Sequence, residues 1–208
     1  MRETDRERHH RFSALFASHR SDIVAYCSWR AASPSDAQDA VSEVFLTAWR
    51  RLDTVPDGDA ARVWLYATAR RVIANQRRSR RRRAALQERL EREPAPASRR
   101  AHASDEDALV HEALRRLRPG DREVLLLAEW EGLTSAQIAG VLGCVTVTAR
   151  GRLHRARTRF RAAFEELSAQ NADAGPRRAA SASNDFSLLR PAAAVAPRGA
   201  AHIREGGS

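Results

Sequence analysis

Apolar residues recur every three or four positions along most of the chain, which is the spacing of one face of an α-helix. In the first part of the chain, a Ser-Pro-Ser-Asp break at 33–36 and a loop with proline and glycine at 54–60 interrupt this pattern. Three helices are therefore expected, over about 12–27, 37–52 and 62–83. Alternation with a period of two, which is typical of half-buried strands, is almost absent. The pattern predicts an all-α fold.

A second helical block is expected over residues 105–167. Its first apolar stripe runs from Leu109 to Leu117. Pro119 then opens a new helix, because proline is favoured at the first helical position. Gly132 follows that helix, at the place where glycine commonly ends a helix in a left-handed conformation.

Two further helical patterns meet at Gly143 and predict a helix-turn-helix. The first opens at Thr134 and carries Gln137 three residues later, which is a capping box that satisfies free amides at a helix start. The second extends from about Thr146 to Phe164 and is dense in arginine. A short helix, a tight turn and a basic second helix are typical of a motif whose second helix reads base edges in the major groove.

Two segments lack the spacing that a packed helix needs. Residues 84–104 contain two prolines and mixed charge, and predict a flexible linker that is helical only at its start. Residues 168–208 are rich in Ala, Pro, Ser and Arg, and predict a disordered tail. The expected organisation is two small helical domains, at 1–83 and 105–167, joined by the linker and followed by the tail.

The composition narrows the class of partner. The chain has 208 residues, a formal net charge of +10 and a sequence pI near 11.2. Such a large positive net charge favours a polyanion as the binding partner. In nucleic-acid binding, much of the affinity comes from neutralising the phosphates. Together with the helix-turn-helix pattern, the charge indicates DNA binding.

Several kinds of chemistry are not expected. Cys27 and Cys144 lie far apart in the sequence, so neither a zinc site nor a disulfide framework is predicted. The sequence has no glycine-rich phosphate loop, metal-ligand cluster or nucleophile motif, so no catalytic residue, metal or cofactor is expected. It also lacks a run of 18 apolar residues and an N-terminal signal core, which favours a cytoplasmic location.

Taken in order, three stretches resemble the extracytoplasmic-function sigma factors, a compact branch of the sigma-70-type transcription initiation factors of bacteria. They read DAQDAVSEVFLTAWRRL at 36–52, WLYATARRVIANQRRSRRRR at 64–83 and LRPGDREVLLLAEWEGLTSAQIAGVLGCVTVTARGRLHRAR at 117–157. The resemblance covers about residues 12–167. It implies a protein that binds core RNA polymerase, recognises the −35 and −10 promoter elements and promotes DNA opening. Many members of the family are held by an anti-sigma factor, so this partner is also a candidate.

The resemblance assigns docking on core polymerase to the polar side of the 36–52 helix. The residues concerned are Gln38, Asp39, Ser42, Glu43 and Leu46. Charge complementarity with a basic coiled coil of the polymerase would speed encounter and fix the register of docking. A solvated surface with no partner is the alternative for these residues.

The resemblance also implies that the 64–83 helix opens and reads the −10 element, where unpaired bases need stacking surfaces and a cationic track. Tyr66 would stack on a base, and Asn75 and Gln76 would bond base edges, as amides do with adenine. The loop at 53–60 would hold a flipped base. Phosphate contacts are expected from Arg70, Arg71, Arg77 and Arg78.

For the −35 element, the resemblance places two groups of residues on the last helix. Those expected to face base edges are Arg150, Gly151, His154 and Arg155. Those expected to contact phosphates are Thr148, Arg152 and Arg157. Arginine suits guanine because its fork pairs with two acceptors on the base.

The chain departs from the family pattern just before this helix, where Val145, Thr146 and Val147 replace the commoner small turn residues. Such changes affect which promoter is read rather than the class of protein.

Two other classes of nucleic-acid-binding protein remain open. One is a regulator that recruits polymerase without melting DNA, and the other is a protein that coats nucleic acid without sequence preference, with a steep salt dependence.

Overall fold

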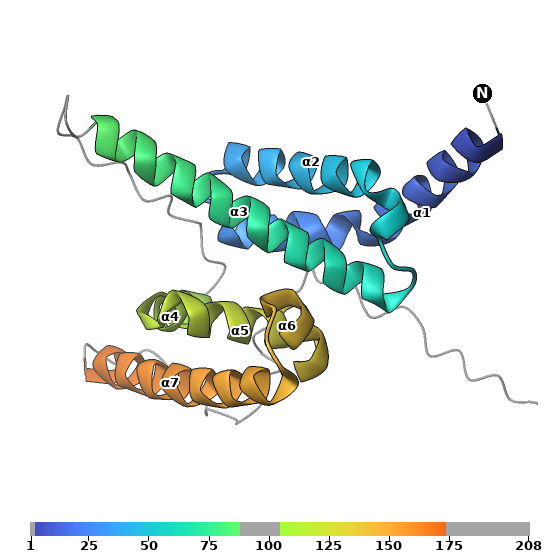
Figure 1. Cartoon of the computed structure of the whole chain (residues 1–208). Coiled ribbons are helices and arrows are strands. Elements are labelled where there is room, and N and C mark those ends of the chain that lie inside the picture. Colours follow the sequence, from blue (N-terminus) through green and yellow to red (C-terminus); the bar gives the residue numbers. More distant parts are fainter. Residues whose placement is uncertain (1–2, 88–104, 174–208) are drawn as a thin grey trace, which may run out of the picture.

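The structure is a computed structural model that describes residues 3–87 and 105–173. Every regular element in these two ranges is a helix, which confirms the all-α prediction (Figure 1). Most of the predicted linker and the predicted tail from residue 174 onward lie outside the described residues.

Three helices form the first domain. They are α1 (Glu3–Arg30), α2 (Pro34–Arg50) and α3 (Asp59–Gln87), with a short 3-10 turn, η1 (Leu52–Thr54), after α2. Ser33 caps α2 by accepting a hydrogen bond from the Asp36 amide at 3.1 Å, as serine does at a helix N-terminus. Helix α1 begins earlier than the apolar spacing predicted, because its first turns are polar and give no periodic signal. Helix α3 also begins earlier, at Asp59 instead of about Arg62.

The core of the first domain follows the predicted apolar stripes. On α2 the buried side chains are Ala37, Ala40, Val44, Phe45 and Ala48. They pack against Ile23 and Tyr26 of α1 and against Leu65 of α3, all of which are fully buried. At one end the rings of Phe16 and Phe45 meet edge to face at 4.7 Å, the arrangement that aromatic quadrupoles favour.

The second domain contains α4 (Asp105–Arg116), α5 (Pro119–Glu129), α6 (Ser135–Leu142) and α7 (Thr146–Asp173). The predicted helix-turn-helix is confirmed. Thr134 and Gln137 form both hydrogen bonds of the capping box, and Gly143 takes the left-handed conformation with φ of 66°. One boundary was wrong. Helix α7 continues to Asp173, past its predicted end at about Phe164, because Leu167 is buried and holds the last turns against the domain.

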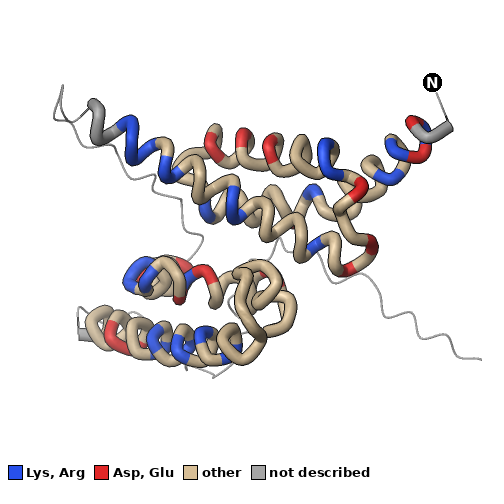
Figure 2. Tube along the Cα trace, in the orientation of Figure 1, with Lys and Arg blue, Asp and Glu red and all other residues tan. Residues whose placement is uncertain are grey.

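The two domains pack directly against each other. Helix α3 lies on α6, where a Cβ added at Gly140 would come within 2.9 Å of Val63. Glycine at that position therefore permits the close approach. Trp29 of α1 stacks on His111 of α4 at 4.7 Å and meets Trp130, just after α5, edge to face at 5.7 Å. Figure 2 shows basic positions along α3 and α7, and acidic positions along α2.

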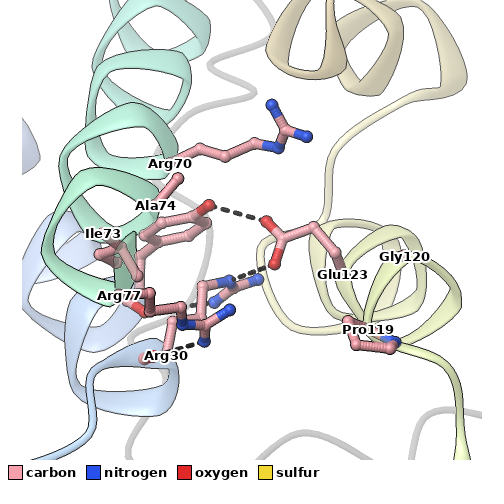
Figure 3. Close-up of a pocket in the computed structure, with 9 residues that line it drawn as sticks. Arg30, Arg70, Ile73, Ala74, Arg77, Pro119, Gly120 and Glu123 are labelled. Atoms are coloured by element: carbon pink, nitrogen blue, oxygen red, sulfur yellow. Dashed lines mark hydrogen bonds and ion pairs between the residues drawn. The ribbon is translucent and has the colours of Figure 1, made fainter. Parts of the chain in front are cut away.

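A buried arginine joins the domains (Figure 3). Arg30, at the end of α1, is 6% exposed and donates to two carboxylates of the second domain, Glu123 at 3.0 Å and Glu131 at 3.2 Å. Its guanidinium carbon also lies 3.7 Å from the ring centre of Tyr26. The Tyr26 hydroxyl donates to Glu123 at 2.7 Å, and the Tyr66 hydroxyl donates to Glu131 at 2.8 Å. Arg62 of α3 also donates to the Glu131 carbonyl, at 2.7 Å. Two cations, two carboxylates and two hydroxyls thus form a single interdomain network.

The electrostatics of this network are set by burial. Removal from water raises the pKa of the Glu131 carboxyl, while Arg30 and Tyr66 act in the opposite direction. Burial alone would lower the pKa of Arg30, but Glu123, Tyr26 and Glu131 outweigh it and the pKa is raised. Arg30 is therefore charged in the interface, where it pairs with two carboxylates of the second domain.

Replacing Arg30 should separate the domains far more than neutralising Glu131. Arg30→Met removes this cation from the buried Glu131 and the partly buried Glu123, and losing one partner of a buried pair costs about 3–5 kcal/mol. Glu131→Gln leaves Arg30 paired with Glu123 and keeps an acceptor for Tyr66, so the cost should be about 1 kcal/mol. Small-angle scattering would show a larger radius of gyration for Arg30→Met with helical circular dichroism retained. Equal expansion in both variants would contradict the role given to Arg30.

Acidification should tighten the interface. Because the pKa of Glu131 is raised when the domains pack, the packed form binds a proton more strongly than the separated form. Packing therefore gains stability as pH falls through that raised pKa toward the ordinary carboxyl value, and loses this gain as pH rises through the raised pKa. His19 has a lowered pKa from burial and acts in the opposite direction below its ordinary value, but this effect is common to the wild type and Glu131→Gln. An interdomain fluorescence-transfer titration should show the tightening in the wild type and not in Glu131→Gln.

Candidate functional site

Helix α7 has one buried side and one exposed side. Ala149, Leu153, Ala156 and Phe160 are buried and recur at intervals of four, three and four, which is the spacing of one helical face. Four of the predicted DNA-contacting residues are exposed: Arg150, Arg152, His154 and Arg155. Thr148 and Gly151 are half-buried. The helix therefore presents most of the predicted −35 set to solvent as one surface.

Arg157, predicted to contact phosphate, is engaged inside its own domain. Its Nε and Nη2 atoms both donate to the same carboxylate oxygen of Glu129 on α5, at 2.9 and 2.7 Å. Arg159 has the same role, because it forms an ion pair with Asp121 of α5. These ion pairs hold α7 at a fixed angle on α5. Sequence spacing could not reveal them, because their partners are 28 and 38 residues away.

The predicted −10 residues divide between two sides of α3. Arg71, Asn75 and Arg78 are exposed and lie on one side, at a spacing of four and three residues. Arg70 and Arg77 lie on another side and line a cleft of about 220 Å³ between the domains, together with residues of α1 and α5 (Figure 3). The helix thus offers one basic side to solvent and turns another toward the second domain.

Three of these predicted residues make intramolecular contacts. Tyr66 is fully buried and donates to Glu131, so it cannot stack on a base while the domains are packed. Gln76 donates to the carbonyl of Asp36 at 3.2 Å, and Arg77 donates to the carbonyl of Arg30 at 2.7 Å. Gln76 and Arg77 therefore also tie α3 to the junction between α1 and α2. Sequence spacing missed the burial of Tyr66 because its partner lies in the other domain.

The predicted polymerase-docking residues form one continuous stripe on α2. All five are exposed: Gln38, Asp39, Ser42, Glu43 and Leu46. Leu46 is 41% exposed, which is unusual for leucine when its neighbours on the helix are so well buried. Spacings of three and four place these residues on one side of the helix, and Figure 1 shows α2 on the side of α3 away from the second domain. The stripe is thus acidic and ends at the apolar Leu46.

A second cleft, of about 440 Å³, lies between α3 and the helix-turn-helix. Its basic lining residues are Arg70, Arg118, Arg152, Arg155 and Arg159. Sequence reasoning did not identify Arg118, and it did not place Arg70 beside the −35 residues. Both became visible only when the fold brought α3, α5 and α7 together. Asp121 and Glu123 offset part of this positive charge.

No helix in the described part of the chain is long and apolar enough to cross a membrane.

Two family models match the chain. Residues 15–83 match Sigma-70 region 2, and residues 107–160 match Sigma-70, region 4. The matched ranges coincide with the two domains described above.

The relatives and solved structures agree with these matches. The ECF RNA polymerase sigma factor SigL of Mycobacterium tuberculosis is 30% identical over 159 residues, covering 74% of this chain and 89% of that protein. The RNA polymerase sigma-E factor of Streptomyces coelicolor is 33% identical over 145 residues, covering 68% and 77%.

Two solved structures share the fold. One is CnrH in complex with the cytosolic domain of CnrY, with a TM-score of 0.52 and 28% identity, covering 74% of this chain and 88% of that chain. The other is the sigma factor RpoE in complex with the anti-sigma factor NepR from Bartonella quintana, with a TM-score of 0.61 and 22% identity, covering 74% and 96%. With both region models matched in order and relatives aligned across both domains, the chain belongs to the extracytoplasmic-function sigma factors of the sigma-70 family.

Proposed function

We propose that this sigma factor guides RNA polymerase through three surfaces. The acidic stripe on α2 docks on core polymerase, the exposed basic side of α3 contacts the −10 element, and the exposed side of α7 reads the −35 element. The polymerase supplies the chemistry, so the chain acts in the cytoplasm as a non-catalytic partner. The observation that carries this assignment is α7, whose side opposite the domain core bears His154 and is flanked by arginines.

Promoter binding requires the two domains to separate. The −10 and −35 elements are about 25 base pairs apart by their names, or about 85 Å at 3.4 Å per base pair. Domains that share the Arg30 network cannot contact both elements at once. The segment between α3 and α4 has the length to permit separation, since its 17 residues can extend to about 55–60 Å. Separation would also release Tyr66 from Glu131 for the stacking role expected of it.

An anti-sigma factor is a further proposed partner. The solved structures of RpoE and CnrH were both determined with another chain bound, in the first case an anti-sigma factor. A partner that spans both domains of this chain would hold them together and keep the −10 and −35 surfaces from acting on one promoter.

The direct test of function is transcription of genomic fragments by bacterial core polymerase lacking any sigma factor. Discrete start sites that depend on this protein are expected, with a shared pattern upstream. Sequence-specific DNA binding without new start sites would favour a regulator that recruits polymerase. Binding without sequence preference would favour a coating protein.

On a promoter found in this way, Arg152→Ala and Arg157→Ala should have different effects. Arg152 is exposed and has a proposed phosphate contact, so its loss should weaken binding and lower the salt dependence of affinity by about one unit of slope. Arg157 is paired with Glu129, so its loss should chiefly lower the thermal stability of the second domain. Fluorescence anisotropy at several salt concentrations and a melting curve for each variant measure both effects. A smaller salt slope for Arg157→Ala at unchanged stability would reverse the assignment.

Reversing a charge on α2 should weaken binding to core polymerase. Glu43→Arg places a cation in the acidic stripe and should reduce affinity about tenfold, or about 1.4 kcal/mol. Glu165→Arg is the matched control, because Glu165 is also an exposed carboxylate but lies on the last turns of α7. Biolayer interferometry against immobilised core polymerase would measure both. Equal losses in the two variants would show that net charge, and not the α2 stripe, controls docking.

A further inference from the structure

The exposed side of α7 has an apolar residue near its start. Val147, the second residue of the helix, is 76% exposed, the largest value among the exposed large hydrophobic residues of the described chain. Valine loses rotamer freedom in a helix and is not favoured there. With most of its surface in water, Val147 contributes little to the domain core. Its side chain is therefore available to a partner.

Helical geometry places Val147 in line with the expected base readers. At about 100° per residue, Val147, Gly151, His154 and Thr158 lie within about 60° of one another. The buried residues Ala149, Leu153, Ala156 and Phe160 form a band of similar width on the opposite side. Val147 thus begins the line of the helix that is farthest from its own domain.

The arginines of α7 flank this line on both sides. Arg152 and Arg159 line the basic cleft on one side, while Arg157 on the other side pairs with Glu129. When a recognition helix enters the major groove, flanking cations meet the phosphates of the two strands and the central line meets the bases. Val147 is on the central line, near the N-terminal end, where recognition helices contact base edges.

Gly151 leaves Val147 uncovered. Side chains on a helix lean toward its N-terminus, so a side chain at 151 would extend over the turn that carries Val147. A Cβ added at Gly151 would meet only the flexible end of Arg155, at 3.4 Å, so packing does not require glycine there. Val147 thus projects as a small apolar side chain beside the space that the missing side chain of Gly151 leaves. This shape is suited to a small apolar group on the DNA.

We propose that Val147 is a specificity-determining residue that contacts the C5-methyl group of a thymine in the −35 element. That methyl is the apolar group that the major groove displays, and small apolar side chains recognise it. The inference rests on the proposed placement of α7 in the groove. Burial of one methyl group is worth about fourfold in affinity.

The test removes the methyl group from the DNA and the side chain from the protein separately. Full-length protein is titrated against a promoter found by the transcription experiment, in which each thymine of the −35 element, on either strand, is replaced in turn by uracil. The wild type should lose about fourfold in affinity at one position. Val147→Ala should bind the thymine promoter about as weakly as the wild type binds that uracil promoter, and should lose nothing more on uracil substitution.

Val145→Ala is the matched control, because Val145 is 69% exposed but precedes the helix and lies off the line. It should retain the sensitivity to uracil. The proposal is overturned if Val147→Ala keeps the full sensitivity at the same thymine, or if no thymine of the element shows any. Failure of the proposed function looks different: the wild type would then show no sequence preference, or Arg150→Ala and His154→Ala would leave affinity unchanged.

Discussion

The packed form of this protein depends on one guanidinium that has left water. Arg30 lies between the domains, and its two carboxylate partners both come from the second domain. A charge this deeply buried is tolerated only where opposite charges and hydrogen bonds replace its hydration. The first domain by itself provides only the Tyr26 ring and carbonyl, so the second domain completes the site.

An interface built in this way can come apart. Its polar groups would be rehydrated on separation, whereas a dry apolar interface would expose surface that water solvates poorly. The aromatic contacts of Trp29 with His111 and Trp130 add shape and area around the network. The family function needs two DNA-reading domains that reach elements far apart, and a paired, hydrogen-bonded interface is compatible with both a packed and a separated state.

The same two helices take part in packing and carry the surfaces proposed to read the promoter. One side of α3 faces the second domain with Arg70 and Arg77, and another side faces solvent with Arg71 and Arg78. Helix α7 uses Arg157 and Arg159 to fix its angle on α5, while Val147, His154 and Thr158 on its outer line are exposed. Arginine is thus used in two ways on one helix, as a brace within the domain and as an exposed cation.

Local periodicity determined much of this protein. The apolar stripes predicted the helices, the capping box at Thr134 and the glycine at 143 predicted the turn, and the exposed stripe on α2 followed from its spacing. These features depend on residues within a few positions of each other, where backbone geometry alone fixes the outcome. Helix ends without apolar residues, such as the start of α1, were not determined in this way.

Only the tertiary structure decided which polar residues serve the protein itself. The sequence predicted stacking for Tyr66 and a phosphate contact for Arg157, and only the fold showed that Glu131 and Glu129 bind these two side chains within the protein. Arg30 gave no signal in the sequence, because its carboxylate partners are 93 and 101 residues away. Sequence spacing reports which side of a helix is apolar, but the pairing of charges across elements depends on distances that only packing creates.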